Sequence, residues 1–323
     1  MAMTYQIASK HNPLGADAPR ELVRYSYKAM RWIMGSDVRV EGAEHLPTTP
    51  ALLACNSTHR FDPLTFRVAL LDLGHDAATV SKGKNWHDPA TAWFAAVLGA
   101  LPLVSRGYLI TMDFMSVVGR RPEPAEYRAL RDHLDGGDSL PAGAPFDQLL
   151  RADRAVLGFQ LNLGQRSYRA AMLDAYASYQ AVFLRQAGEV VRSGRHIHMY
   201  PQGTVSSRLS EGRIGAVQVA AALRIPVVPV GICGAATAFR SASNPLPRRG
   251  VVTVKLGEPY HLPEGALPPD FRAFDPVHEE ANRSVLQRLT GDLMERINAL
   301  VEPGASWSVD RASDGKQGTH RFA

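Results

Sequence analysis

The segment VQVAAALRIPVVPVGICGA, residues 217–235, shows most directly which class of fold this chain adopts. Its first part, residues 217–224, predicts a helix, and its second part, residues 225–235, is an apolar run rich in valine and isoleucine. A near-continuous apolar run of this length is typical of a strand that is buried on both faces, as the strands of parallel sheets are. A helix that leads directly into such a strand indicates an α/β fold.

Strands and helices alternate on either side of this segment as well. Apolar and β-branched runs predict strands at residues 37–42, 50–57, 77–81, 101–105, 196–200 and 251–262. Helical periodicity predicts helices at residues 64–73, 89–98, 176–192 and 284–301. We therefore expect an α/β fold in a single domain, with a mostly parallel central sheet flanked by helices, plus an insertion.

Three segments and one insertion describe the expected domain organisation. Residues 1–35 form an N-terminal amphipathic helical segment, residues 36–302 the main domain, and residues 303–323 a flexible, polar tail. Within the main domain the pattern loosens over residues 107–175, where glycine, proline and charged residues are frequent. This stretch is either a lid over a site or a surface loop without a part in binding.

Composition limits the possible functions. The chain has 323 residues, of which 45% are hydrophobic, so it can bury a full core. Its 36 Lys and Arg residues against 31 Asp and Glu residues give a formal charge of +5, which suits an anionic surface or substrate. The sequence has no long basic run and no zinc-spaced cysteine set, so no nucleic-acid partner is expected.

The cysteines and the apolar runs indicate in which cellular compartment the protein is expected and whether it crosses a membrane. Cys55 and Cys233 each lie beside a predicted strand, as buried free thiols do, and this favours a reducing compartment such as the cytoplasm. The N-terminus has no secretory signal pattern. The longest apolar run, residues 90–104, is shorter than the roughly 20 residues that a membrane-spanning helix needs. We therefore do not expect the chain to cross a membrane.

A basic amphipathic helix is predicted at residues 19–34. Its apolar residues recur at helical spacing and are Leu22, Val23, Tyr27, Met30, Ile33 and Met34. Its basic residues lie largely on the other side and are Arg20, Arg24, Lys28 and Arg31. With the interfacial Trp32, this pattern predicts either contact with the inner face of a membrane or an ordinary surface helix with solvated arginines.

The segment CNSTHRFDPL, residues 55–64, carries the first candidate for chemistry. A histidine oriented by a carboxylate can deprotonate a hydroxyl near neutral pH, and His59 and Asp62 are residues of the right types. Their spacing of three places them on one face if the segment is the first turn of a helix. Alternatively, Asp62 caps a helix that starts at Pro63.

Two further features are candidates for substrate binding. The segment YPQGTVSS, residues 200–207, lies where a strand gives way to a glycine turn, where main-chain N–H groups and hydroxyls can hold an anionic or polar group. An ordinary Pro-x-Gly turn is the alternative. Arg106 follows a predicted strand, where it either binds a phosphate or carboxylate or is a solvated surface charge.

Taken in order, these segments resemble the glycerolipid acyltransferase family, which includes the lysophosphatidic acid acyltransferases. NSTHRFDP resembles the family's first block, Asn-His-x4-Asp, and GALPLVSR with Arg106 its second. YPQGTVS resembles the third block, Phe-Pro-Glu-Gly-Thr-Arg-Ser, and IPVVPVGI the apolar Pro-x-x-Pro strand of the fourth. The likeness covers about residues 36–106 and 176–300, and the ordered set is more specific than any single block.

The first and third blocks depart from the family pattern. Ser57 stands at the place of the family's catalytic histidine, and His59 lies two residues later. In the third block, Gln202 replaces the family's glutamate and Val205 its arginine. Arg208 or Arg213 is a candidate to restore the missing charge.

The resemblance implies an acyltransferase that moves a fatty acyl group from acyl-CoA or an acyl carrier protein to a hydroxyl of a lipid-like acceptor such as a lysophospholipid. His59 would be the general base and Asp62 would orient it. The expected substrate-binding residues are Ser57, Arg106, Gln202, Gly203, Thr204, Ser206 and Arg213. No metal or cofactor is expected, since the thioester is a co-substrate. The alternatives are Ser57 as a nucleophile, a non-catalytic lipid-binding protein on this fold, and acyl transfer to water or an amine.

Overall fold

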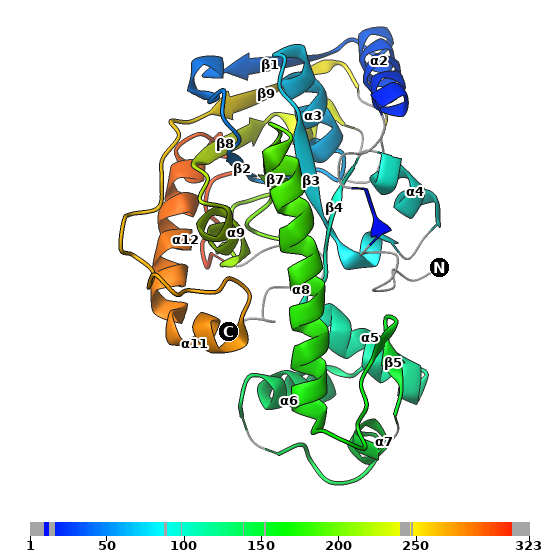
Figure 1. Ribbon diagram of the computed structural model, residues 1–323. Helices are drawn as coiled ribbons and strands as arrows, with labels where there is room; N and C mark the ends of the chain where they lie inside the picture. The colour runs from blue at the N-terminus through cyan, green and yellow to red at the C-terminus, as the bar shows by residue number, and fades with distance from the viewer. Residues whose placement is uncertain are drawn as a thin grey trace.

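A seven-stranded sheet forms the centre of the protein in a computed structural model, which describes residues 10–12, 17–86, 89–97, 99–137, 139–151, 153–239, 246 and 248–311 (Figure 1). The strand order is β1-β9-β8-β2-β7-β3-β4. The strands are β1 (Ser36–Glu41), β2 (Leu52–Cys55), β3 (Ala77–Lys82), β4 (Leu101–Leu103), β7 (His196–Met199), β8 (Val227–Cys233) and β9 (Gly250–Leu256). Each lies within a run predicted from the sequence or overlaps one.

Five of the six neighbouring pairs in this sheet are parallel, and only β8 and β9 are antiparallel. The predicted α/β fold with a mostly parallel central sheet is therefore confirmed. Strands β2, β3, β4, β7 and β8 all run in one direction, so their carboxyl ends lie at the same edge of the sheet. The first block follows β2 and the third follows β7, which are hydrogen-bonded neighbours.

Helices cover both faces of the sheet, because the side chains of a strand alternate between its faces. Leu53 and Cys55 of β2 face a core that includes residues of α3 (Asp62–Asp72) and α10 (Ala235–Ala238). Leu52 and Ala54 face the opposite core. That core is covered by α8 (Tyr168–Arg192), α9 (Gly215–Leu223) and α12 (Arg283–Asn298), which lie in front of the sheet in Figure 1.

Much of the expected insertion forms a separate lobe around the N-terminal half of α8, at the lower end of the molecule in Figure 1. The lobe contains α5 (Arg106–Val118), α6 (Pro124–Leu134), α7 (Phe146–Arg151), β5 (Ala155–Val156) and β6 (Phe159–Gln160). At its centre Asp113 is fully buried and accepts two hydrogen bonds from Arg154, at 2.7 and 2.8 Å, and one from the Tyr168 hydroxyl at 2.8 Å. This buried cluster gives the lobe defined structure.

The helix α8 is longer than the sequence predicts. It begins at Tyr168 and not at Tyr176, because the Ser167 side chain accepts a hydrogen bond from the main-chain N–H of Ala170 and so caps it. The strand β4 is shorter than predicted for a similar reason. It ends at Leu103, and Ser105 caps α5 by accepting from the N–H of Tyr108.

The N-terminal helix α2 (Asp17–Ile33) turns its basic residues toward the protein. Arg24 and Lys28 both bind the Asp72 carboxylate of α3 at 2.9 Å, and Arg31 is buried beside the ring of Tyr27. The stripe formed by Leu22, Tyr25, Trp32 and Ile33 is exposed instead. Solvated arginines, one feature of the surface-helix alternative, are therefore not what the structure shows for Arg24 and Arg31, whereas Lys28 is exposed. The side chain of Arg20 lies outside the described residues.

The beginning of the expected flexible tail is packed on the main domain. The main-chain N–H of Leu209 donates to Ala305 O at 3.0 Å, and the indole of Trp307 donates to Glu295 of α12 at 3.1 Å. Residues 303–311 are thus held by pairing that a polar composition does not predict, and residues 312–323 lie outside the described residues. Across the part of the chain that the structure describes, no helix is both long and apolar enough to span a membrane.

Candidate functional site

The first block forms the loop between β2 and α3. Asn56 fixes its start, because its side chain donates to Ile232 O at 3.0 Å and accepts from the N–H of Ile232 at 2.7 Å. This pair of bonds ties the first block to β8, the strand of the fourth block. The loop then turns within six residues, and α3 begins at Asp62.

Asp62 is fully buried, and its carboxylate holds the main chain of the loop. Its Oδ2 accepts hydrogen bonds from the N–H groups of Thr58 at 2.8 Å and of His59 at 2.7 Å. Its Oδ1 has no hydrogen-bond partner among the residues that the structure describes. Burial raises the pKa of Asp62 to about 7, although the hydrogen bonds from His59 and Thr58 oppose that shift.

His59 is 1% exposed, and its imidazole lies flat against the ring of Phe239, with ring centres 3.9 Å apart and an interplanar angle of 11°. Its Nδ1 accepts a hydrogen bond from the main-chain N–H of Phe61 at 3.2 Å. A neutral imidazole that accepts at Nδ1 carries its proton on Nε2. The expected contact, in which the Asp62 carboxylate orients the imidazole, is therefore absent from the described geometry: Asp62 binds the main chain of His59.

The third block forms a tight turn after β7. Gly203 has φ of 65°, in the left-handed region, and its N–H donates to Tyr200 O at 2.9 Å. A side chain at this position would also approach the Arg213 side chain, since a Cβ there would lie 3.0 Å from Nε. The structure thus brings Gly203 and Arg213 together, as expected for two residues of one substrate site.

The remaining residues of the third block support the turn. The buried Gln202 amide donates to Arg208 O at 3.1 Å and to the Ser210 hydroxyl at 3.2 Å. The Thr204 hydroxyl donates to Val205 O at 3.4 Å. Gln202 therefore holds main chain in place of the family's glutamate, and in the described geometry its amide points into the loop.

The first and third blocks meet directly. The main-chain N–H of Ser206 donates to Ser57 O at 2.9 Å, and both serines are buried. The contact extends the parallel pairing of β2 and β7, in which Ala54 lies opposite Met199. Ser57, Ser206, His59, Asp62 and the Gly203 turn consequently lie around the carboxyl ends of two adjacent parallel strands, the usual position of ligand sites in α/β sheets.

Arg106 lies apart from this group. Two strands, β7 and β3, separate β2 from β4, and Arg106 begins α5 just beyond β4. Its guanidinium binds Asp135 at 2.6 Å and also Glu279, and it lies over the ring of Tyr176. None of these partners belongs to the first or third block, so the structure does not bring Arg106 together with the other expected substrate-binding residues.

Two aromatic residues of the site were missed in the sequence. Phe239 stacks on His59, yet no motif marks it, because it lies beyond the fourth block. Tyr200 begins the third block, and its buried hydroxyl has no hydrogen-bond partner among the described residues. A phenol at the place where the family pattern has phenylalanine was the only available signal.

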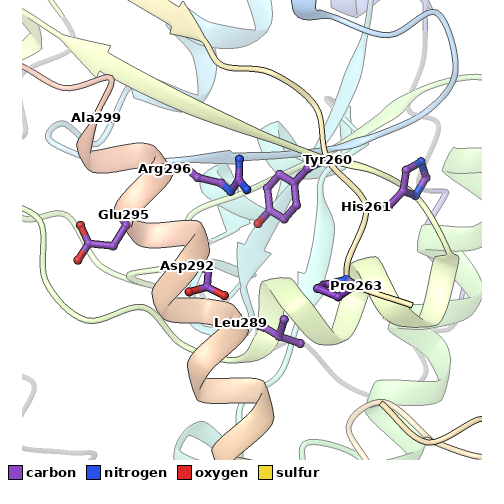
Figure 2. Close-up of a pocket in the computed structure, with 8 residues that line it drawn as sticks. All are labelled: Tyr260, His261, Pro263, Leu289, Asp292, Glu295, Arg296 and Ala299. Carbon is purple, nitrogen blue, oxygen red and sulfur yellow. The ribbon is translucent and has the colours of Figure 1, made fainter. Parts of the chain in front are cut away.

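A separate pocket of about 540 Å³ lies between α12 and the chain after β9 (Figure 2). Its lining includes Tyr260, His261, Asp292 and Arg296, and the Arg296 guanidinium lies 4.2 Å from the centre of the Tyr260 ring. Tyr260 pairs with Val227 at the start of β8, whereas Asn56 binds near its end. The pocket is therefore at the opposite edge of the sheet from the first block.

No group of three or more His, Cys, Asp or Glu side chains is arranged to hold a metal ion within the described part of the chain. The arrangement at the carboxyl ends of β2 and β7 instead offers titratable groups, a histidine and a carboxyl, beside a half-buried glycine turn. Such an arrangement suits proton transfer and the binding of a polar or anionic group.

Comparison with known proteins agrees with the motifs. The acyltransferase family model matches residues 153–233, which contain the third and fourth blocks. A crystal structure of the 1-acyl-sn-glycerophosphate (LPA) acyltransferase PlsC from Thermotoga maritima is similar, with a TM-score of 0.40 and 18% identity, covering 86% of this chain and 80% of that chain. No curated protein matches the chain. The family match covers about a quarter of the chain and includes two of the four blocks on which the resemblance to acyltransferases rests.

Proposed function

We propose that this protein transfers a fatty acyl group from an acyl thioester to a hydroxyl of a lipid-like acceptor such as a lysophospholipid. The observation that carries the proposal is the bond between Ser206 and Ser57, which joins two acyltransferase-like blocks at the ends of neighbouring parallel strands. The family model covers one of these blocks and the strand that leads into it. The donor is acyl-CoA or an acyl carrier protein.

In this proposal His59 takes the proton of the acceptor hydroxyl while the hydroxyl oxygen attacks the thioester carbonyl. The thiolate of the donor then leaves and takes up the proton. For this role Nδ1 or Nε2 of His59 must be available as an acceptor, so the imidazole has to exchange its bond with the N–H of Phe61 or turn when substrate binds. Catalytic hydrogen bonds are often incomplete in a protein without substrate and form in the complex.

The third-block turn binds the polar part of the substrates in this proposal. The main-chain N–H of Thr204, next to the engaged N–H of Gly203, suits the oxyanion of the tetrahedral intermediate. Arg213, which packs beside Gly203, suits an anionic group of the acceptor and takes over the charge that Val205 lacks. In this proposal Arg106 contributes by holding α5, the end of α6 and α11 (Pro276–Ala281) together and not by binding the acceptor.

A membrane surface is the source of the acceptor in this proposal. The exposed stripe of α2, with Leu22, Tyr25, Trp32 and Ile33, presents apolar and aromatic side chains that suit the interfacial region of a bilayer. The helix thus attaches to lipid through its apolar side, while Arg24 and Lys28 stay bound to Asp72.

Acyl transfer is tested with the purified protein, labelled acyl-CoA or acyl carrier protein, and a panel of lysolipids, alcohols and amines. Loss of thioester and formation of product are measured for wild type, His59→Ala and the matched control His261→Ala, a histidine of the pocket at the opposite edge. We expect transfer to a lysolipid hydroxyl in wild type and control, and a loss of about 10²–10⁴-fold in His59→Ala. Equal turnover in all three removes His59 from the mechanism.

A non-catalytic lipid-binding protein is the second candidate, and one observation favours it: the Asp62 carboxylate accepts hydrogen bonds from the main-chain N–H groups of Thr58 and His59. In that case the same panel shows no transfer with any acceptor, while the protein still binds lysolipid. Transfer to water or to an amine alone identifies a hydrolase or an amine acyltransferase.

The variant Ser57→His distinguishes two cases: a protein that has lost the catalytic histidine, and one in which His59 has replaced it. It restores a histidine at the place that the family pattern gives it. Higher turnover in this variant than in wild type means that the remaining site is intact. If activity appears only in this variant, the natural protein is the non-catalytic form.

A further inference from the structure

Two buried oxygen atoms beside the candidate site have no hydrogen-bond partner among the described residues. They are Oδ1 of Asp62 and the hydroxyl of Tyr200. Buried polar groups are nearly always hydrogen-bonded, to protein or to ordered water, because an unpaired one costs about 1–3 kcal/mol. Two such atoms at one site therefore point to an interaction that completes both.

Their places in the fold bring the two side chains to the same face of the sheet. Asp62 and Phe66 lie one turn apart on α3, so they share a face of that helix. The ring of Phe66 lies 4.6 Å from the ring of His198, which lies 4.6 Å from the ring of Tyr200. His198 and Tyr200 are two residues apart at the end of β7 and so point to one side of the sheet.

The parallel pairing of β2 and β7 also places Tyr200 at the level of the first block. Ala54 is opposite Met199, so Tyr200 follows alongside Cys55, the residue at which the loop to Asp62 begins. Helix α3 then returns over this face, with Asp62 in its first turn. Asp62 and Tyr200 consequently lie at the level where both strands end, close enough to interact electrostatically.

The groups around Asp62 leave Tyr200 as the principal donor on this side. Cys55 of β2, Tyr27 of α2 and Tyr200 of β7 all interact electrostatically with Asp62. The Tyr27 hydroxyl is engaged with the Thr65 hydroxyl at 2.5 Å, and a buried thiol is a weak donor. Burial, and then the Asp62 carboxylate, raise the pKa of Tyr200 well above its usual value, so its hydroxyl keeps its proton.

We propose that Tyr200 is a positioning residue for Asp62: its hydroxyl donates toward Oδ1 through one water molecule, and so sets the pH at which Asp62 ionises. A hydrogen bond to the charged form of a carboxyl group lowers its pKa, which opposes the effect of burial. In the proposed acyl transfer this keeps Asp62 ionised near neutral pH and holds the His59 loop in place through Oδ2. Only this catalytic consequence rests on the proposed function.

The test measures the titration of the Asp62 carboxyl group in the protein without substrate. The full chain is labelled with ¹³Cγ-aspartate, the Asp62 signal is identified by its absence in Asp62→Asn, and its chemical shift is followed from pH 4 to pH 9 by NMR. We expect Tyr200→Phe to raise the titration midpoint by about one unit, the effect of losing one hydrogen bond to a charged group. The control Tyr260→Phe removes another buried hydroxyl that has no hydrogen-bond partner among the described residues, in the pocket of Figure 2, and leaves the midpoint unchanged.

An unchanged midpoint in Tyr200→Phe overturns the proposal, and so does an equal change in Tyr260→Phe. If the phenylalanine variant does not fold, Tyr200→Met removes the hydroxyl with a more adaptable side chain, and the same shift is expected. A protein that shows the shift but transfers no acyl group retains this inference and contradicts the proposed function. A protein that transfers acyl groups but shows no shift of the titration midpoint supports the proposed function and contradicts this inference.

Discussion

The Asp62 carboxylate accepts a hydrogen bond of 2.7 Å from the main-chain N–H of His59, and not from its imidazole. The same oxygen accepts from the N–H of Thr58, so Asp62 closes the first-block loop on itself. The imidazole is placed by other means, through the ring of Phe239 and the N–H of Phe61. Both residues of the expected catalytic pair thus have structural partners of their own, and the function of each can be tested separately.

The first prediction concerns the ionisation of Asp62. Its pKa is raised from 3.8 to about 7, so between these values the folded protein binds a proton that the unfolded chain does not. The stabilising contribution of protonated Asp62 is therefore complete below about pH 4. As the pH rises to about 7 this contribution is lost, and the free energy of unfolding falls by on the order of 4 kcal/mol. We expect this slope in the difference between wild type and Asp62→Asn, measured by urea unfolding from pH 4 to pH 8. A difference that does not vary with pH contradicts the raised pKa.

The second prediction concerns the third-block turn. Gly203→Ala places a side chain in the left-handed region and against Arg213, so we expect a loss of about 1–2 kcal/mol in the free energy of unfolding, with a fall in acyl transfer. The matched control is Gly291→Ala in α12, where an added Cβ meets nothing within 4 Å and helix propensity favours alanine. Urea unfolding of both variants is the measurement, and a Gly203→Ala protein as stable as Gly291→Ala rules out the strained turn.

The third prediction concerns Arg106. Arg106→Ala removes the nearer of two cations from the buried Glu279 carboxylate and leaves only the half-exposed Arg283 at 3.8 Å, so we expect a loss of about 3 kcal/mol in stability. Arg120→Ala breaks the exposed pair with Glu126 and serves as the control, with little change expected. The KM for the acceptor in the folded Arg106→Lys variant is the second measurement. A KM that rises strongly in a variant of normal stability restores Arg106 to the substrate site.

The fourth prediction concerns attachment to lipid. Trp32 is 83% exposed on α2, and its transfer into a bilayer interface contributes enough that Trp32→Ala should weaken vesicle binding about tenfold. Because Arg24 and Lys28 are bound to Asp72, binding should depend little on the salt concentration or on anionic lipid. Co-sedimentation with zwitterionic and anionic vesicles measures both effects, with Val277→Ser, a change of another exposed apolar residue, as the control. Binding that vanishes at high salt contradicts this mode of attachment.

Local pattern was sufficient to predict the fold and the order of its elements. The helix and strand at residues 217–235 appear as α9 and β8, since periodicity and β-branched content depend only on neighbouring residues. The first and third blocks were identified in the same way. Their meeting through Ser206 and Ser57 required the pairing of β2 with β7, which lie more than a hundred residues apart in the chain.

The roles of individual side chains could be predicted less well from the sequence. Arg24 and Arg106 have the composition of solvent-facing or anion-binding residues, yet one binds Asp72 and the other binds Glu279, 173 residues further along the chain. His59 and Asp62 are close in sequence, and their types suggest an acid–base pair. In the structure, however, the buried Asp62 carboxylate binds a main-chain N–H group and not the imidazole.

The sequence by itself determined the parallel α/β sheet, the acyltransferase-like blocks and their order. The tertiary structure alone decided that Arg106 holds elements together, that Leu22, Tyr25, Trp32 and Ile33 of α2 face outward, and that Phe239 and Tyr200 lie beside the candidate site. The physical reason is that secondary structure depends on short-range periodicity, whereas the partner of a charged or aromatic side chain depends on which distant segments fold against it and on how far they exclude water.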